Sequence, residues 1–242
     1  MAWVEHDHVD ADALAVAVAR QLEHVCCDAI VARGRALLAL AGGRTPVPAY
    51  RRFARAALRW RDVTAMPTDE RCVPHDHPAC NVAGLRAAFA AADGSVDGGA
   101  AGIVIESLTT IDGEPGRSLA HARAMLTGHP LPFDAVVLGM GDDAHTASLF
   151  PGAEELAVAI DPAAAGDAYR IDPVPLPTEA PFPRITLSAA RLLRARCVYL
   201  LATGADKRDV LRQAQRSNDP LMHPIAAMLH APGTVVHIHW SP

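Results

Sequence analysis

Cysteine is scarce in this chain of 242 residues, and long hydrophobic runs are missing. The five cysteines are odd in number and fit no zinc or thioredoxin spacing, which predicts reduced, structural thiols rather than a disulfide framework. No stretch reaches the roughly 18 consecutive apolar residues of a membrane-spanning helix. The first ten residues lack the basic and apolar regions of a signal peptide. The sequence therefore predicts a cytoplasmic protein with no membrane partner.

Charge and metal-ligand patterns argue against two further classes of protein. The formal net charge of −5 makes nucleic acid or an anionic membrane surface a poor main partner. Histidines spaced two residues apart occur three times, at His6 and His8, His75 and His77, and His237 and His239. Such a pair shares one face of a strand, but no carboxylate or thiolate accompanies it at ligand spacing. The sequence therefore predicts no metal site.

Lysine is almost absent, because 21 of the 22 basic residues are arginine and only Lys207 is not. This lysine lies in TGADK, after a predicted strand at 197–202 and in the first turn of a predicted helix at 205–215. An ammonium there opposes the helix dipole, a small cost that indicates an anion nearby. The alternative is a salt bridge to Asp206 or Asp209.

Short apolar runs alternate with segments of helical period along most of the chain. The runs predict strands at residues 36–41, 62–66, 103–106, 133–138, 185–187, 197–202 and 234–239. The periodic segments predict helices at 12–31, 45–57, 81–90, 114–126, 188–194, 205–215 and 224–229. This alternation predicts a single α/β domain over residues 1–242, with a mostly parallel sheet and helices on both faces. The proline-rich residues 161–183 form either a functional excursion or a poorly ordered segment.

Polar side chains gather at five points where predicted strands end or helices begin, which is where open α/β sheets bind ligands. Two of them are TGADK, with Lys207, and FPRITLS, with Arg184. The first cluster, GGRTP, contains Gly42, Gly43, Arg44 and Thr45. Two glycines let the backbone approach a ligand closely, and the following helix offers free N–H groups at its positive end. The cluster favours phosphate, although glycine-rich turns of this kind are common.

Two further clusters carry candidate catalytic side chains. In TDERCVP, Asp69, Glu70 and Arg71 taken alone indicate a solvated salt-bridge cluster. The functional alternative makes Arg71 an anion or oxyanion ligand held by a neighbouring carboxylate. In GMGDDAHTASLFPG, the Asp143 carboxylate can orient the His145 imidazole and raise its basicity. His145 is therefore a candidate general base for water, the alternative being a histidine that merely fills a loop.

Five segments, in this order, resemble the 6-phosphogluconolactonase family of the glucosamine-6-phosphate isomerase/6-phosphogluconolactonase superfamily. They are LALAGGRTP, TDERCVPHDHPACN, FDAVVLGMGDDAHTASLFPG, PRITLS and LLATGADKRDVL, and they run from about residue 37 to residue 211. The resemblance implies a Rossmann-like fold and hydrolysis of 6-phosphoglucono-δ-lactone to 6-phosphogluconate, in the oxidative pentose phosphate pathway. It implies no metal or organic cofactor and no obligate protein partner.

The resemblance also implies roles for individual residues. His145 matches the general base for water, Asp143 its orienting partner and Arg71 the active-site arginine. The phosphate-side positions are Gly42, Gly43, Arg44, Thr45, Arg184 and Lys207. A δ-lactone is an activated ester, so a positioned base and a cation for the developing oxyanion suffice without a covalent nucleophile.

Two positions depart from the usual family pattern. Ala144 replaces the glycine usually found between the aspartate and the histidine. If this position has a positive φ, alanine is strained there. Cys80 stands where a serine usually precedes the asparagine.

Two other functions compete with lactone hydrolysis. The first is isomerisation and deamination of amino-sugar phosphates, whose usual sequence after the shared turn is IAFNEP. Residues 146–151 read TASLFP instead, which favours the lactonase. The second is a non-catalytic sugar-phosphate sensor, which would need neither Asp143 nor His145.

Overall fold

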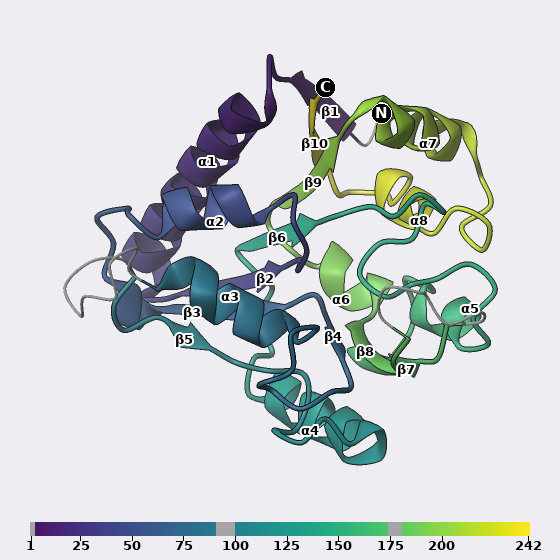
Figure 1. Cartoon of the computed structure of the whole chain (residues 1–242), viewed down its shortest axis with the longest axis horizontal. Helices are drawn as coiled ribbons and strands as arrows, with labels where there is room; N and C mark the ends of the chain where they lie inside the picture. The colour runs from purple at the N-terminus through teal and green to yellow at the C-terminus, as the bar shows by residue number, and fades with distance from the viewer. Residues whose placement is uncertain (1–2, 91–99, 174–180) are drawn as a thin grey trace.

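The computed structural model describes residues 3–90, 100–173 and 181–242 (Figure 1). The strands are β1 (Trp3–Asp7), β2 (Ala36–Leu40), β3 (Val63–Pro67), β4 (Asp69–Arg71), β5 (Val104–Ile105), β6 (Ala135–Leu138), β7 (Ala168–Ile171), β8 (Arg184–Leu187), β9 (Val198–Thr203) and β10 (Val236–Ser241). The helices are α1 (Ala11–Arg33), α2 (Val47–Phe53), α3 (Asn81–Phe89), α4 (Pro115–Thr127), α5 (Leu156–Ala159), α6 (Ala189–Leu193), α7 (Ala205–Arg216) and α8 (Ile225–Leu229). A 3-10 turn spans Trp60–Asp62.

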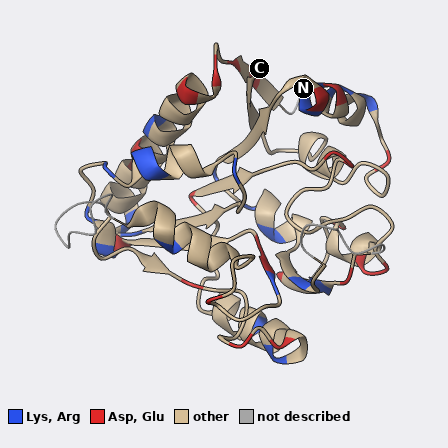
Figure 2. Cartoon of the chain, viewed as in Figure 1, with Lys and Arg blue, Asp and Glu red and all other residues tan. Residues whose placement is uncertain are grey.

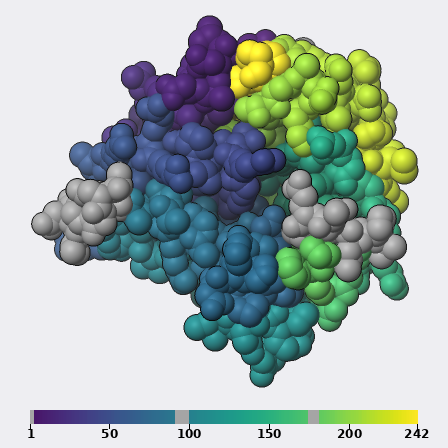
Figure 3. All heavy atoms as spheres, in the orientation of Figure 1, coloured from purple at the N-terminus to yellow at the C-terminus, as the bar shows by residue number. Residues whose placement is uncertain are grey.

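A seven-stranded sheet with the order β1-β10-β9-β6-β2-β3-β5 forms the centre of the molecule. Every neighbouring pair in it is parallel. The remaining strands form a small antiparallel sheet, β4-β8-β7, at one side. Because β1 pairs with β10, the first and last strands of the chain lie side by side, and purple and yellow atoms meet in Figure 3. These features confirm the predicted α/β class with a mostly parallel sheet.

Both faces of the parallel sheet are buried, as the apolar strand sequences require. In β2, Leu38 and Leu40 pack with α1, α2 and α3 on one face. Leu37 and Ala39 face the opposite core, which includes residues of α4, α6, α7 and α8. Figure 1 shows α1 to α3 grouped on one side of the sheet. Acidic and basic residues are interspersed over the helices (Figure 2), and no helix of the described residues is long and apolar enough to cross a bilayer.

Three strands escaped the sequence analysis, and one helix is shorter than predicted. β4 has only three residues, β1 is an edge strand rich in polar residues, and β7 lies inside the proline-rich segment 161–183. Residues 174–180 of that segment lie outside the described residues, so its role stays a prediction. The helix predicted at 45–57 ends at Phe53 because residues 55 and 56 close tighter turns, and Thr45 does not cap it.

Four histidines form a ladder across the pairing of β1 with β10. Nε2 of His6 lies 3.2 Å from Nδ1 of His237, and Nε2 of His8 lies 2.9 Å from Nδ1 of His239. The rings of His6 and His239 stack with their centroids 4.6 Å apart. Burial, followed by the neighbouring histidines, lowers the pKa of His239 to about 3. His239 is therefore uncharged in the folded protein at neutral pH.

We expect acid to destabilise the protein through His239. Between pH 6.5 and about 3, the unfolded chain binds a proton at this residue while the folded chain does not. The free energy of unfolding therefore decreases as the pH is lowered, by at most about 1.4 kcal/mol per pH unit for this group. The free energy of unfolding is measured by urea titration at about pH 7.5 and about pH 5. Between these two values, His239→Phe should lose about 2 kcal/mol less of it than the wild type does.

The matched control is His24→Phe, because His24 is an exposed histidine on α1. This variant should lose as much stability on acidification as the wild type. Equal acid losses for the wild type and for His239→Phe would contradict the prediction.

Candidate active site

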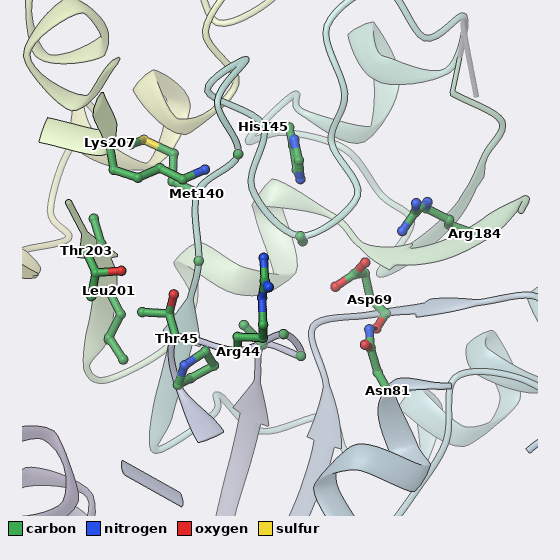
Figure 4. Close-up of a pocket in the computed structure, with 18 of the residues that line it drawn as sticks. Arg44, Thr45, Asp69, Asn81, Met140, His145, Arg184, Leu201, Thr203 and Lys207 are labelled. Carbon is green, nitrogen blue, oxygen red and sulfur yellow. Dashed lines mark hydrogen bonds between the residues drawn. The ribbon is translucent and has the colours of Figure 1, made fainter. Parts of the chain in front are cut away.

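A cavity of about 350 Å³ opens where β2, β6 and β9 end (Figure 4). Its wall includes Gly42, Gly43, Arg44, Thr45, Asp69, Arg71, Asn81, Met140, Gly141, His145, Arg184, Thr203 and Lys207. All the predicted site residues except Asp143 are in this wall, and Asp143 contacts the cavity through His145. Parallel strands bring their carboxyl ends to one edge of the sheet, which is why segments distant in sequence meet here.

His145 and Asp143 form a close pair in the loop after β6. Nδ1 of His145 lies 2.5 Å from Oδ1 of Asp143, and the backbone N–H of His145 donates to the same oxygen. Partial burial opposes ionisation of Asp143, but the hydrogen bonds from His145 outweigh it and lower the pKa of this carboxyl. An ionised carboxylate can only accept, so Nδ1 carries the proton. Nε2 of the neutral ring is then free to accept a proton from water.

The loop that carries His145 has a tightly determined backbone. Ala144 has φ of 62° and is buried, as anticipated for a position usually held by glycine. Ala147 also has a positive φ, of 48°. A Cβ on Gly141 would lie 2.0 Å from Nδ1 of His145, so only glycine fits beneath the imidazole. The ring also packs against Phe150 at a centroid distance of 4.2 Å.

Glu70 shows that the cluster after β3 is not a solvated one. The side chain is fully buried and accepts hydrogen bonds from the backbone N–H groups of Arg71, Asn81 and Val82. Burial raises the pKa of Glu70, although these three bonds oppose the shift. The Cys80 thiol donates to the same carboxylate, so cysteine satisfies this position where serine is usual. The solvated interpretation of TDERCVP was wrong.

Arg71 and Arg184 are opposite each other in the pairing of β4 with β8. Arg71 donates from Nη1 to the carbonyl of Ala79, not to a neighbouring carboxylate, and its buried Nε has no hydrogen-bond partner among the described residues. The guanidinium of Arg184 lies 5.1 Å from the ring centre of Phe150. Burial lowers the pKa of Arg184, and the charge of Arg71 lowers it further. Two guanidinium groups on one wall of a cavity suit an anionic ligand.

Lys207 lines the cavity and is paired with a residue that the sequence analysis did not consider. Its Nζ lies 2.7 Å from Oδ1 of Asp142, which belongs to the loop of His145. Within the described residues it forms no ion pair with Asp206 or Asp209, so that alternative was wrong. In Figure 4, Lys207 and Arg184 approach the cavity from opposite sides, with His145 between them.

The glycine-rich turn after β2 is shaped by close contact with α3. A Cβ on Gly42 would lie 2.1 Å from Oδ1 of Asn81, and Gly43 has φ of 92°. Figure 4 shows Arg44 and Thr45 pointing into the cavity from this turn. Glycine is therefore required twice, once for space and once for conformation.

Two further cavity residues were missed as site residues. Asn81 is the first residue of α3, and its side chain donates to the carbonyl of Asp69. Asp69 is nearly buried and accepts from the Ser148 hydroxyl at 2.5 Å. Asp69 lies just after β3 and Asn81 lies at the start of α3, and these positions were the available signals. Among the described residues, no group of three or more His, Cys, Asp or Glu side chains could hold a metal ion.

Residues 9–239 match the family of glucosamine-6-phosphate isomerases and 6-phosphogluconolactonase. The chain belongs to this family. It is 35% identical to the 6-phosphogluconolactonase of Pseudomonas putida over 237 residues, which cover 98% of this chain and 92% of that protein. It is 36% identical to the 6-phosphogluconolactonase of Pseudomonas aeruginosa over 236 residues, which cover 96% and 90% of the two chains.

Solved structures agree with this assignment. A 6-phosphogluconolactonase from Shewanella baltica superposes with a TM-score of 0.89 at 32% identity, covering 99% of this chain and 98% of that one. A monomeric glucosamine-6-phosphate deaminase superposes with a TM-score of 0.72 at 17% identity, covering 98% and 96% of the two chains. The second likeness shows only that both branches of the family share the fold.

We expect Ala144→Gly to keep or raise activity. Alanine at φ of 62° carries backbone strain on the order of 1 kcal/mol, which glycine removes while the carbonyl and N–H groups of the loop stay in place. Lactone hydrolysis measured by base uptake should be at least equal to that of the wild type, whatever happens to stability.

Gly141→Ala is the matched control in the same loop. It adds the methyl group that Ala144→Gly removes, at a position where the new Cβ would meet the His145 ring. This control should lose most activity. A large loss in Ala144→Gly itself would show that the loop needs the buried alanine methyl more than it needs relief of strain.

Proposed function

We propose that this protein hydrolyses 6-phosphoglucono-δ-lactone to 6-phosphogluconate, with His145 activating the water. The observation that carries the proposal is the imidazole whose Nδ1 is held by Asp143 and whose Nε2 is left to accept a proton inside a cavity with cationic walls. The names of the relatives support the same substrate. We assign the phosphate to Lys207 and the backbone of Gly43–Thr45, with Arg184 reaching from the opposite wall.

The reaction then needs one base and one cation. Nε2 of His145 takes a proton from water as the water oxygen bonds to the lactone carbonyl carbon. The carbonyl oxygen becomes an oxyanion, which Arg71 stabilises from the wall of the cavity. When the bond to the ring oxygen breaks, the His145 imidazolium returns its proton to that oxygen. The product is the open-chain acid, and the imidazole is neutral again.

Asp143 supports this cycle at both stages. Its carboxylate fixes the tautomer of His145 before reaction, and it stabilises the imidazolium while that charge exists. Binding of the phosphate holds the lactone carbonyl at a set distance from the base, which turns a bimolecular encounter into reaction within one complex. A δ-lactone is an activated ester, and the imidazolium protonates its leaving oxygen, so no covalent intermediate with the protein is needed.

The two competing functions have less support. Amino-sugar-phosphate isomerisation rests on the shared fold alone, since the glucosamine-6-phosphate deaminase is only 17% identical. A non-catalytic sensor would gain nothing from an imidazole oriented by a carboxylate, yet His145 and Asp143 are held 2.5 Å apart. Both arguments favour the lactonase.

We expect His145→Ala to lower kcat by about 10²–10⁴-fold, because the water loses its general base. The assay uses freshly generated lactone, with base uptake measured against the spontaneous hydrolysis. Inhibition by inorganic phosphate should stay nearly unchanged, since the phosphate contacts remain. Wild-type activity in this variant would remove the assignment of His145.

We expect Lys207→Ala to lower kcat/KM, because a charge-assisted contact to a phosphate dianion is lost. The decrease should correspond to a loss of about 2–4 kcal/mol of transition-state stabilisation. Hydrolysis of the corresponding lactone without a phosphate should barely change, and inorganic phosphate should inhibit less. Equal losses on the phosphorylated and unphosphorylated lactones would contradict the phosphate role. If Lys207 were only the partner of the exposed Asp142, both substrates would be hydrolysed as before.

A further inference from the structure

We propose that Asp142 is an internal counter-ion that holds Lys207 when no ligand is bound and that a phosphate group must displace. It would lower the affinity of the site for every anion by the same factor. This inference rests on the proposed phosphate role of Lys207. It adds a residue that controls how tightly substrate and product are held.

The contact between Asp142 and Lys207 joins two separate elements of the site. Oδ1 of Asp142, in the loop after β6, lies 2.7 Å from Nζ of Lys207, in the first turn of α7. Asp206 and Asp209 lie on the same helix as the lysine and are exposed, yet the ammonium reaches across to the loop instead. The ammonium of this cavity-lining lysine is therefore already paired with a carboxylate.

The exposure of the two partners makes exchange possible. The side chain of Asp142 is 86% exposed, whereas that of Lys207 is 27% exposed. An ion pair with a partner this exposed contributes little, so a phosphate dianion can replace the carboxylate, and Asp142 then returns to water. Lys207 thus stays compensated until a phosphate group arrives.

The rest of the loop does not depend on this contact. The backbone N–H of Gly141 donates to the carbonyl of His145, and the N–H of Ala144 donates to the carbonyl of Gly141. Both bonds close turns that contain Asp142, and neither involves its side chain. Release of the carboxylate should therefore leave the imidazole in place. The effect of Asp142 should appear in KM and in product inhibition, not in kcat.

Substrate and product carry the same phosphate group, so a counter-ion that weakens one also weakens the other. Asp142 would keep the product acid from remaining bound after the ring has opened. The cost is a higher KM for the lactone. A counter-ion therefore suits a site that must release a product resembling its substrate.

The test is calorimetric titration of the full-length protein with inorganic phosphate, at about 0.15 M salt so that distant charges are screened. Asp142→Asn should bind phosphate about 3–10-fold more tightly than the wild type, because the competing carboxylate is gone and its repulsion with it. In the lactone assay this variant should show a lower KM, tighter inhibition by 6-phosphogluconate and an unchanged kcat. The side chain is exposed, so the variant should fold as the wild type does, and a urea titration checks this.

Asp206→Asn and Asp209→Asn are the matched controls, since each removes one negative charge from the same helix without touching the ion pair. Each should change phosphate affinity less than about 2-fold. If these controls gain as much phosphate affinity as Asp142→Asn, the effect comes from the removal of any nearby negative charge, and the inference is overturned. Unchanged phosphate binding in Asp142→Asn would also overturn the inference. Weaker binding would overturn it too, because Asp142 would then be a residue that positions Lys207 for the ligand.

Lys207→Ala separates this inference from the proposed function. If phosphate binding is the same with and without Lys207, the phosphate role itself fails, and the counter-ion role fails with it. If Lys207→Ala weakens phosphate binding while Asp142→Asn changes nothing, only the counter-ion role fails. Calorimetry gives these answers whether or not the protein hydrolyses the lactone.

Discussion

The buried carboxylate of Glu70 connects the parts of the protein on which the site depends. It accepts the N–H groups of Arg71, Asn81 and Val82, and so ties the short strand β4 to the first turn of α3. Without it, the N-terminus of α3 would leave backbone donors unsatisfied in the interior. The same contact fixes Arg71, and through the pairing of β4 with β8 it fixes the position of Arg184.

A second constraint is the parallel sheet, which has both faces covered by helices and therefore leaves only its ends for polar chemistry. The turn after β2, the loop after β6 and the start of α7 after β9 meet at one end. Their side chains contribute different functions to a single cavity: backbone amides and glycine space from the first, the imidazole and carboxylates from the second, and the ammonium from the third. The small antiparallel sheet adds the two guanidinium groups from a different direction.

The loop of His145 illustrates how strain and fit are combined. Gly141 leaves space for the ring, Ala144 accepts a left-handed backbone conformation, and Phe150 packs against the imidazole. With its Nδ1 also bonded to Asp143, the imidazole can turn little. This arrangement explains why polar residues are so dense directly after a core strand.

The sequence alone determined the alternation of strands and helices, because apolar runs and helical periods are local properties of residues near one another. It also predicted the candidate base His145, its partner Asp143 and the lone lysine Lys207, since each follows a predicted strand. It could not show that Glu70 is buried, that Lys207 pairs with Asp142, or that β1, β4 and β7 are strands. Those features depend on partners far away in the chain, and a short polar strand or a charged side chain acquires its environment only when the tertiary structure supplies the partner.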